Sequence, residues 1–162
     1  MKRLRIITIF CCVIAGYAYG YVSPVLTSKF DEFGNICCDD EKARLDNFAI
    51  QLGNNPDTQG YIIFYGGRRQ NYPYCDSSRL RLPRRGEAEA RAARMKPYLV
   101  NSRGVDSNHI VVINGGYRES WSAEIWIVPK GANPPTPTPT VQPQEIKFRR
   151  GKAKSRDYRC EV

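Results

Sequence analysis

Residues 61–65, Tyr-Ile-Ile-Phe-Tyr, form an unbroken run of aromatic and β-branched side chains between Gly60 and Gly66. A short apolar run without polar alternation is typical of a strand that is covered on both faces. We therefore expect this segment to be the central strand of a sheet, with helices packed against that sheet.

A helix is predicted on each side of this strand in the sequence. The first begins after an N-cap at Asp39 or Asp40 and ends at the turn-forming residues 53–56. The second covers about residues 87–101 and should kink at Pro97, which lacks a backbone N–H. Both have apolar residues at helical spacing: Leu45, Phe48, Ala49 and Leu52 in the first, and Ala88, Ala92, Met95 and Leu99 in the second.

Three further apolar segments complete the predicted domain. Residues 110–113 and 123–128 are expected to be strands, and the apolar stretch 25–30 precedes a turn-rich segment at 31–35. The order strand, helix, strand, helix, strand, strand predicts an α/β fold, an α+β sandwich in which helices cover a mixed sheet. Residues 21–131 are enough for one self-sufficient domain.

The N-terminal residues have the features of a secretory signal peptide. Three basic residues among the first five precede a largely apolar run over residues 6–18, and Ala18-Tyr19-Gly20 offers a small-residue cleavage site. The run is shorter than the roughly 20 residues that span a bilayer. We therefore expect residues 1–20 to be removed on export, leaving no transmembrane segment in the mature chain.

Two segments of different composition follow the predicted domain. Residues 132–145 are a Pro/Thr-rich linker, in which the repeated Pro-Thr pattern is expected not to pack and to act as an extended spacer. Residues 146–162 are a basic tail, with seven basic residues and one acid between positions 147 and 159, and such a run is expected to be solvated.

The charge of the predicted mature chain favours anionic partners. Without the signal peptide, 22 basic and 16 acidic residues give a formal charge of +6. In an exported protein those partners would be lipopolysaccharide, acidic lipids, cell-wall polymers or acidic proteins, and not nucleic acid. The alternative is that the charge serves solubility alone.

Four cysteines remain after removal of the signal peptide: Cys37, Cys38, Cys75 and Cys160. An even number in an exported chain predicts two disulfides. Because a bond between the neighbours Cys37 and Cys38 would strain the peptide between them, we expect one of them to pair with Cys75 and the other with Cys160. The single histidine, His109, and the absence of Cys-x-x-Cys spacing argue against a metal site.

Three motifs carry a resemblance to a known family. Ala43-Arg44-Leu45-Asp46 is similar to the family's first helix, and Arg91-Ala92 followed by Tyr98-Leu99 matches its second-helix motif. Residues 115–120, Gly-Gly-Tyr-Arg-Glu-Ser, are similar to the turn before its last strand. Over roughly residues 25–130 the chain thus resembles the OmpA-like C-terminal domain family. The resemblance implies a β-α-β-α-β-β domain whose mixed sheet is covered by two helices.

The resemblance also implies a ligand and a site. Family members bind peptidoglycan by clamping the zwitterionic diaminopimelate of its stem peptide between an aspartate after the central strand and an arginine on the second helix. Arg91 matches that arginine, but the position of the aspartate falls at Arg68 or Arg69, next to Gly67. An arginine there would repel an ammonium group, whereas an alignment shifted by several residues would bring Asp76 nearer the site.

We therefore expect an anionic ligand to bind at Arg91, Arg68, Arg69 and Gly67. The alternative for Arg91 is a helix-surface arginine paired with Glu87, four residues earlier. The expected protein is a non-catalytic cell-envelope binding protein, located in the periplasm, at the outer membrane or at the cell surface. The alternative is a protein-interaction or structural subunit of an envelope assembly that has lost peptidoglycan binding.

Catalysis and cofactors are not expected. No Ser-His-acid or Cys-His grouping surrounds the single histidine. Glu119 and Glu124 are a conceivable carboxylate pair for glycoside cleavage, but nothing in the sequence places them on facing walls.

Overall fold

The computed structural model describes residues 27–72 and 79–158. The predicted signal peptide, Cys75, Asp76 and Cys160 lie outside these residues. Cys37 and Cys38 are both disulfide-bonded.

A mixed sheet forms the middle of the molecule. Its four long strands stand in the order β1 (Ser28–Phe33), β6 (Ser122–Pro129), β2 (Thr58–Tyr72) and β5 (Ile110–Ser120). Strand β2 pairs antiparallel with β6 and parallel with β5, and its end also pairs with the short strand β3 (Arg79–Arg81). The prediction of residues 61–65 as a central strand is therefore confirmed.

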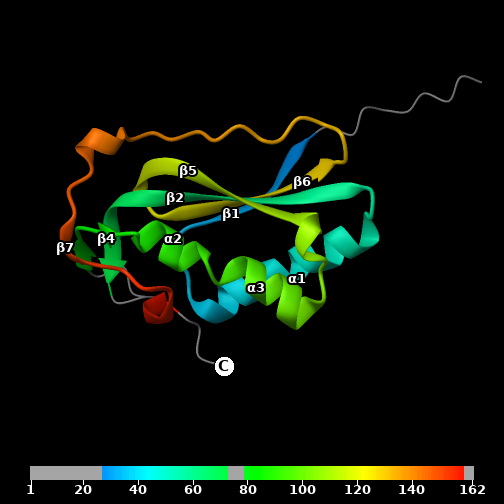
Figure 1. The fold of residues 1–162 in the computed structure, drawn as a ribbon, viewed down its shortest axis with the longest axis horizontal. Helices are drawn as coiled ribbons and strands as arrows, with labels where there is room; N and C mark the ends of the chain where they lie inside the picture. The colour runs from blue at the N-terminus through cyan, green and yellow to red at the C-terminus, as the bar shows by residue number, and fades with distance from the viewer. Residues whose placement is uncertain (1–26, 73–78, 159–162) are drawn as a thin grey trace, which may run out of the picture.

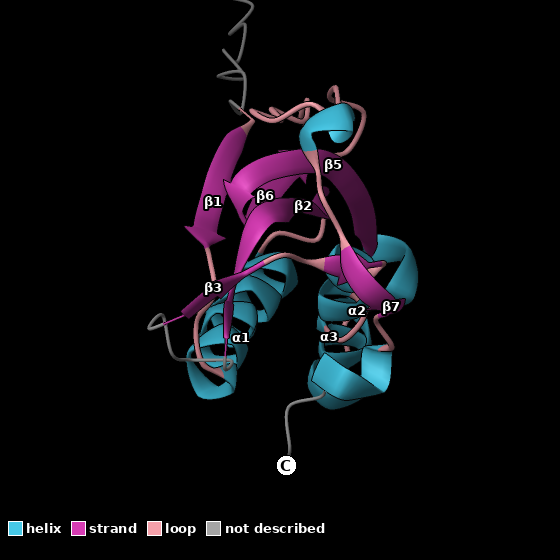
Figure 2. Ribbon diagram, turned by 90° about the vertical axis from the view of Figure 1, so that its left-hand side faces the viewer, coloured by secondary structure: helices cyan, strands magenta, loops and turns pink. Residues whose placement is uncertain are grey.

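The helices lie together on one face of this sheet (Figures 1 and 2). They are α1 (Cys38–Asn54), α2 (Glu87–Ala92) and α3 (Met95–Arg103). Their apolar stripes and the facing sheet side chains make one core, which includes Leu45, Phe48, Leu52, Ile62, Phe64, Met95 and Leu99. Helical periodicity thus predicted the buried faces.

The second helical segment is divided, where the sequence predicted one kinked helix. Helix α2 ends at Ala92 and α3 begins at Met95, so Pro97 lies in the first turn of α3. A backbone N–H has no intrahelical partner in a first turn, and proline is therefore tolerated there. Starting a new helix at Met95 avoids the hydrogen bond that Pro97 would break inside a longer one.

Three strands end later in the sequence than predicted. Strand β1 includes residues 31–33, which were expected to turn, and β2 and β5 continue to Tyr72 and Ser120. Pairing explains the extension of β2 and β5, because Gly66 lies opposite Tyr117 and Arg69 opposite Ser120. Glycine is required at position 66, where a Cβ atom would come within 2.7 Å of the Tyr117 ring.

The Pro/Thr segment, residues 132–145, packs along the sheet face opposite the helices (Figure 1). Val141 forms a β-bridge with Tyr117 and is buried, as are the sheet side chains Ile63 and Tyr65. The structure therefore differs from the expectation of a spacer that does not pack. Prolines restrict the unfolded chain, so ordering this segment costs less conformational entropy than ordering most sequences.

The basic tail packs against the domain from residue 146 to residue 158. After the short helix η2 (Pro143–Glu145), strand β7 (Arg149–Lys152) pairs in parallel with β4 (Arg84–Arg85), and helix η3 (Ser155–Tyr158) lies beside α2. The side chains of Ile146, Ala153 and Tyr158 are buried. The tail was expected to be solvated, and for residues 146–158 this prediction is wrong. These residues pack because three apolar side chains are spaced among the cations.

Candidate functional site

Arg91 is one of the most deeply buried side chains in the described residues, with 1% of its surface exposed. Its guanidinium carbon lies 5.5 Å from the ring centre of Trp121 and 5.4 Å from that of Tyr158. Its Nη1 donates to Asn35 Oδ1 at 2.9 Å, and its Nε lies 3.9 Å from Glu87. Burial lowers the pKa of Arg91, and the negative charge of Glu87 opposes that effect. The predicted pairing with Glu87 is present, but not on the helix surface.

At the start of α2, the Glu87 carboxylate is also contacted by two other arginines. Its Oε2 accepts from the backbone N–H of Arg84 at 2.7 Å, and its Oε1 lies 3.5 Å from Nη2 of Arg81. The Glu87 side chain is itself only 1% exposed. A buried carboxylate in the first helical turn suits the positive end of the helix dipole and offsets the neighbouring arginines.

The other predicted ligand residues follow each other along β2. Arg68 is partly exposed and forms ion pairs with Glu119 at 2.9 Å and with Glu145 at 3.8 Å, so its carboxylate partners differ from that of Arg91. Arg69 is exposed, whereas Gly67 is buried. The structure thus brings Gly67 to the buried site, while the two arginines beside it lie at the surface.

A small hollow of about 10 Å³ joins Gly67 to Glu87 and is lined also by Gln70 and, from the tail, Phe148. Gln70 is 1% exposed, and its amide nitrogen and oxygen have no hydrogen-bond partner among the described residues. The volume is on the scale of one water molecule, which needs at least roughly 10–15 Å³. Sequence reasoning did not identify Gln70, because the residues that line the hollow with it, such as Glu87 and Phe148, are distant in sequence.

The basic ribbon, defined here as residues 84–85 and 147–156, brings strand β4 together with strand β7 and the residues around it at one end of the molecule (Figure 1). It contains no acidic residue and eight basic ones: Arg84, Arg85, Lys147, Arg149, Arg150, Lys152, Lys154 and Arg156. Among the described residues only Arg84 of these eight forms an ion pair, with Asp157 at 3.1 Å. Uncompensated cations this close together attract anions and raise their local concentration.

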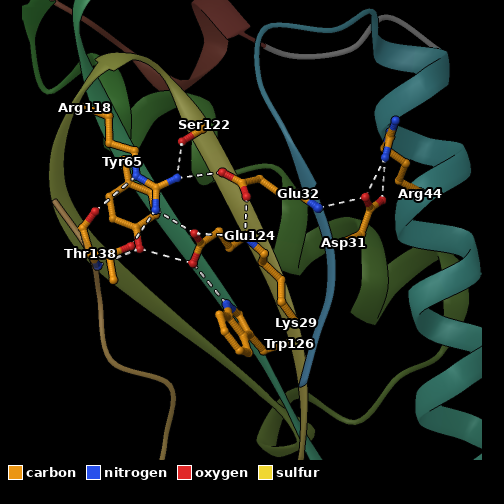
Figure 3. A network of polar contacts seen from close by, with 10 residues as sticks. All are labelled: Lys29, Asp31, Glu32, Arg44, Tyr65, Arg118, Ser122, Glu124, Trp126 and Thr138. Atoms are coloured by element: carbon orange, nitrogen blue, oxygen red, sulfur yellow. Dashed lines mark hydrogen bonds and ion pairs between the residues drawn. The ribbon is translucent and has the colours of Figure 1, made fainter. Parts of the chain in front are cut away.

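Glu119 and Glu124 do not form a catalytic carboxylate pair in the structure. Glu119 is exposed and paired with Arg68, whereas Glu124 is 3% exposed and accepts from Tyr65, Arg118 and Trp126 (Figure 3). Burial disfavours the ionised form of Glu124, but the hydrogen bonds from Arg118 and Trp126 outweigh it and hold its pKa below the usual value. Both oxygens of Glu124 are therefore committed to the fold.

The remaining chemistry-bearing residues are also engaged structurally. His109 bonds through Nε2 to the carbonyl oxygen of Thr58. Within the described ranges, no three His, Cys, Asp or Glu side chains are grouped so as to hold a metal ion. A groove of about 710 Å³ lies between α1 and α3, and the buried acid on its wall, Glu41, is bound by Arg94.

These features define a mixed α/β protein with helices on one face of its sheet and a strongly basic end. No family model matches the chain, and comparison with curated proteins finds no match. None of the helices in residues 27–72 and 79–158 is both long enough and apolar enough to span a membrane.

Proposed function

We propose that this chain is an exported, non-catalytic binding protein of a bacterial cell envelope, in which an OmpA-like domain associates with peptidoglycan or another anionic envelope polymer. It would act in the periplasm, at the outer membrane or at the cell surface. The observation that carries this proposal is the basic ribbon, with eight cations and a single ion pair among the described residues.

The domain is compatible with the expected architecture. The long strands and the helices follow each other as β1, α1, β2, α2, α3, β5 and β6, with the short strands β3 and β4 inserted between β2 and α2, and the helices lie on one side of a mixed sheet. Apart from these insertions and the divided helix, this order is compatible with a β-α-β-α-β-β domain. The motif residues Arg91-Ala92 lie in α2 and Tyr98-Leu99 lies in α3, so both halves of the motif are helical, although two helices carry them in place of one. These points support the OmpA-like assignment.

The ribbon suits a repeating polyanion better than a single small ligand. Its cations extend from β4 through β7 to η3, so successive negative groups of one polymer can each meet a side chain. Arginine can bind a carboxylate or phosphate with two parallel hydrogen bonds, and three of the five arginines in the ribbon, Arg85, Arg150 and Arg156, are exposed. Because these charges are in contact with solvent, binding through them is expected to weaken as salt increases.

The geometry favours the ribbon over the zwitterion clamp as the main binding surface. Arg91 is enclosed by Trp121 and Tyr158, and arginines occupy the positions after Gly67 where the resemblance calls for an acid. An ammonium group would find no complementary charge at Arg68 or Arg69.

A second candidate function, docking of an envelope protein, is favoured by a mainly apolar groove beside β5. The groove has a volume of about 530 Å³ and is lined by Phe64, Ala92, Pro97, Val100 and Val112, among others. Val111 and Val112 are each 37% exposed on this strand. An exposed edge strand beside an apolar groove is suited to a partner strand or an apolar side chain. A site-specific crosslinker at Val112 tests this candidate, because it should trap such a partner only when the groove is used.

Co-sedimentation with purified peptidoglycan sacculi, at low and at raised salt, tests the main proposal. The double variant Arg150→Gln/Lys152→Gln should lose most retention at low salt. The matched control Lys42→Gln/Lys130→Gln removes the same charge from α1 and from the residue after β6, and should be retained like the native chain. Equal retention of both variants would overturn the role of the ribbon, and retention that resists salt and depends on Arg91 would favour the clamp.

A further inference from the structure

Tyr158 fills a cleft lined by three arginines. Its ring centre lies 5.9 Å from the guanidinium carbon of Arg84 and 5.4 Å from that of Arg91, and the tyrosine side chain is 7% exposed. Arg84 Nη2 donates to the Tyr158 hydroxyl at 3.1 Å, and Arg94 Nη1 donates to the Tyr158 carbonyl oxygen at 2.6 Å. The cleft therefore contacts the aromatic face, the hydroxyl and the main chain of one residue.

The residue before Tyr158 is recognised as well. The Asp157 carboxylate lies 3.1 Å from Nη2 of Arg84, and Ala90 of α2 and Ala153 of the tail pack with the tyrosine as a small apolar cluster. An ion pair, a phenol hydrogen bond and cation–π contacts on consecutive residues specify an acid followed by tyrosine.

Two of the three arginines of this cleft have side chains held by the domain itself. Arg91 donates to Asn35, Arg94 donates to Glu41 at 2.7 Å, and the backbone N–H of Arg84 donates to Glu87. None of these contacts comes from the tail. The side chains of Arg91 and Arg94 are therefore positioned without the tail, which reduces the entropy lost when a ligand binds. The guanidinium of Arg84, by contrast, bonds to Asp157 and Tyr158 of the tail itself.

The pairing that holds the tail over the cleft is short and electrostatically opposed. Strands β4 and β7 share two register positions, Arg84 opposite Arg149 and Arg85 opposite Lys152. Like charges placed directly across a strand pair destabilise that pair. The segment is therefore docked by its buried side chains, by this short pairing and by two backbone hydrogen bonds, from the N–H of Arg149 to the Pro83 carbonyl and from that of Ala153 to the Arg85 carbonyl.

We propose that the cleft formed by Arg84, Arg91 and Arg94 is a peptide-binding site for an acidic residue followed by tyrosine, and that Asp157–Tyr158 occupies it as an intramolecular ligand. A segment of the same chemistry from another polypeptide competes for the cleft when the tail is displaced. The site shares Arg84 with the basic ribbon, but its other two arginines, Arg91 and Arg94, lie outside the ribbon.

The direct test is binding of a labelled, C-terminally amidated peptide of residues 152–158 to the full-length chain, followed by fluorescence anisotropy. The variant Tyr158→Ala should bind it at least about tenfold more tightly than the native chain, because a tethered competitor acts at a high effective concentration. The same peptide carrying Y158A is the matched control probe and should not bind.

Two further variants keep the test decisive. Ala153→Asp places a charge in the buried part of the tail and should open the cleft without replacing any of its three arginines, so it should also bind the peptide. Arg84→Gln in the Tyr158→Ala background should abolish the gain. The proposal is overturned if Tyr158→Ala and Ala153→Asp, both folded by circular dichroism, bind the peptide no better than the native chain, or if the control probe binds equally well.

The source of the competing segment follows from one more measurement. If full-length native chain binds to Tyr158→Ala protein, a second copy can supply the segment. Peptide binding without binding of the native chain supports a segment from a different protein.

Discussion

The guanidinium carbon of Arg118 lies 3.6 Å from the ring centre of Tyr65, and both side chains donate to the same carboxylate, Glu124 (Figure 3). Thr138 completes the arrangement, because its backbone N–H donates to the Tyr65 hydroxyl and its side-chain oxygen accepts from Arg118. One buried acid thus links strands β2, β5 and β6 to the Pro/Thr segment.

Replacing this acid should destabilise the fold. Glu124→Gln removes the charge that Arg118 and Trp126 bond, and hydrogen bonds to charged groups contribute about 1.5–3 kcal/mol each. We expect a loss of that order in the free energy of unfolding, measured by chemical denaturation. Glu119→Gln is the control, since surface ion pairs such as that with Arg68 contribute about 0–1 kcal/mol. Equal losses in the two variants would contradict a special role for Glu124.

Stability should fall in acid. The hydrogen bond from Arg103 lowers the pKa of Asp46, and the pKa of Glu124 is lowered despite its burial. Below the ordinary carboxyl values of 3.8 and 4.5 the unfolded chain takes up protons before the folded chain does, so stability decreases as pH falls through the folded pKa values. Denaturation midpoints across this range should show the decrease, and Glu124→Gln should make it less steep. A slope unchanged in that variant would exclude Glu124 as a contributor.

Stability should also fall in alkali. Burial raises the pKa of Tyr158 above its ordinary value of 10.0, and it does the same for Tyr98 and Tyr117. As pH rises past 10.0, these tyrosines lose their protons in the unfolded chain before they do so in the folded chain. Their contribution to the free energy of unfolding is therefore fully present below pH 10.0 and is lost as pH rises through the folded pKa values. Absorbance titration of tyrosinate should show late-ionising tyrosines, with one fewer in Tyr158→Phe. Ionisation of every tyrosine at the ordinary value would contradict this prediction.

Detaching the Pro/Thr segment should leave the rest of the domain folded. Val141→Asp puts an unpaired charge at a position that is 3% exposed, which disfavours packing of the segment on the sheet. Limited proteolysis should then cut within residues 132–145 faster than in the native chain. Thr136→Asp adds the same charge at an exposed position of the segment and should leave the rate unchanged. Similar cleavage of both variants would show that packing at Val141 does not protect the segment.

The elements that the sequence predicted well are those specified by local patterns. The apolar run at 61–65 and the helical stripe that includes Leu45 and Phe48 require only the side chains of the element itself, and both are buried as expected. The continuations of β2 and β5 are polar and glycine-rich, and they become strands because they pair with each other, which no local pattern encodes.

For the candidate site, too, the sequence predicted the local contacts but not the contacts between distant parts of the chain. The pairing of Arg91 with Glu87 follows from helical spacing, and the structure contains it. The burial of Arg91 depends on Trp121 and Tyr158, which are distant from it in the sequence. Trp121 lies between strands β5 and β6, and Tyr158 lies in the tail. The tail was expected to be solvated because cations dominate its composition, and its few apolar side chains gave too weak a signal to predict docking.

The packed C-terminal segment also has a consequence for biosynthesis. The ribosome makes residues 132–158 after the sheet and the helices, so the sheet face bearing Ile63 and Tyr65 and the cleft around Arg91 stay uncovered until these residues have been made. Contacts between such distant parts of a chain form slowly, and an intermediate that exposes apolar surface is prone to aggregate. A nascent chain truncated before the Pro/Thr segment should therefore stay bound to chaperones. A chain that includes residues 132–158 covers this sheet face and should be released from them.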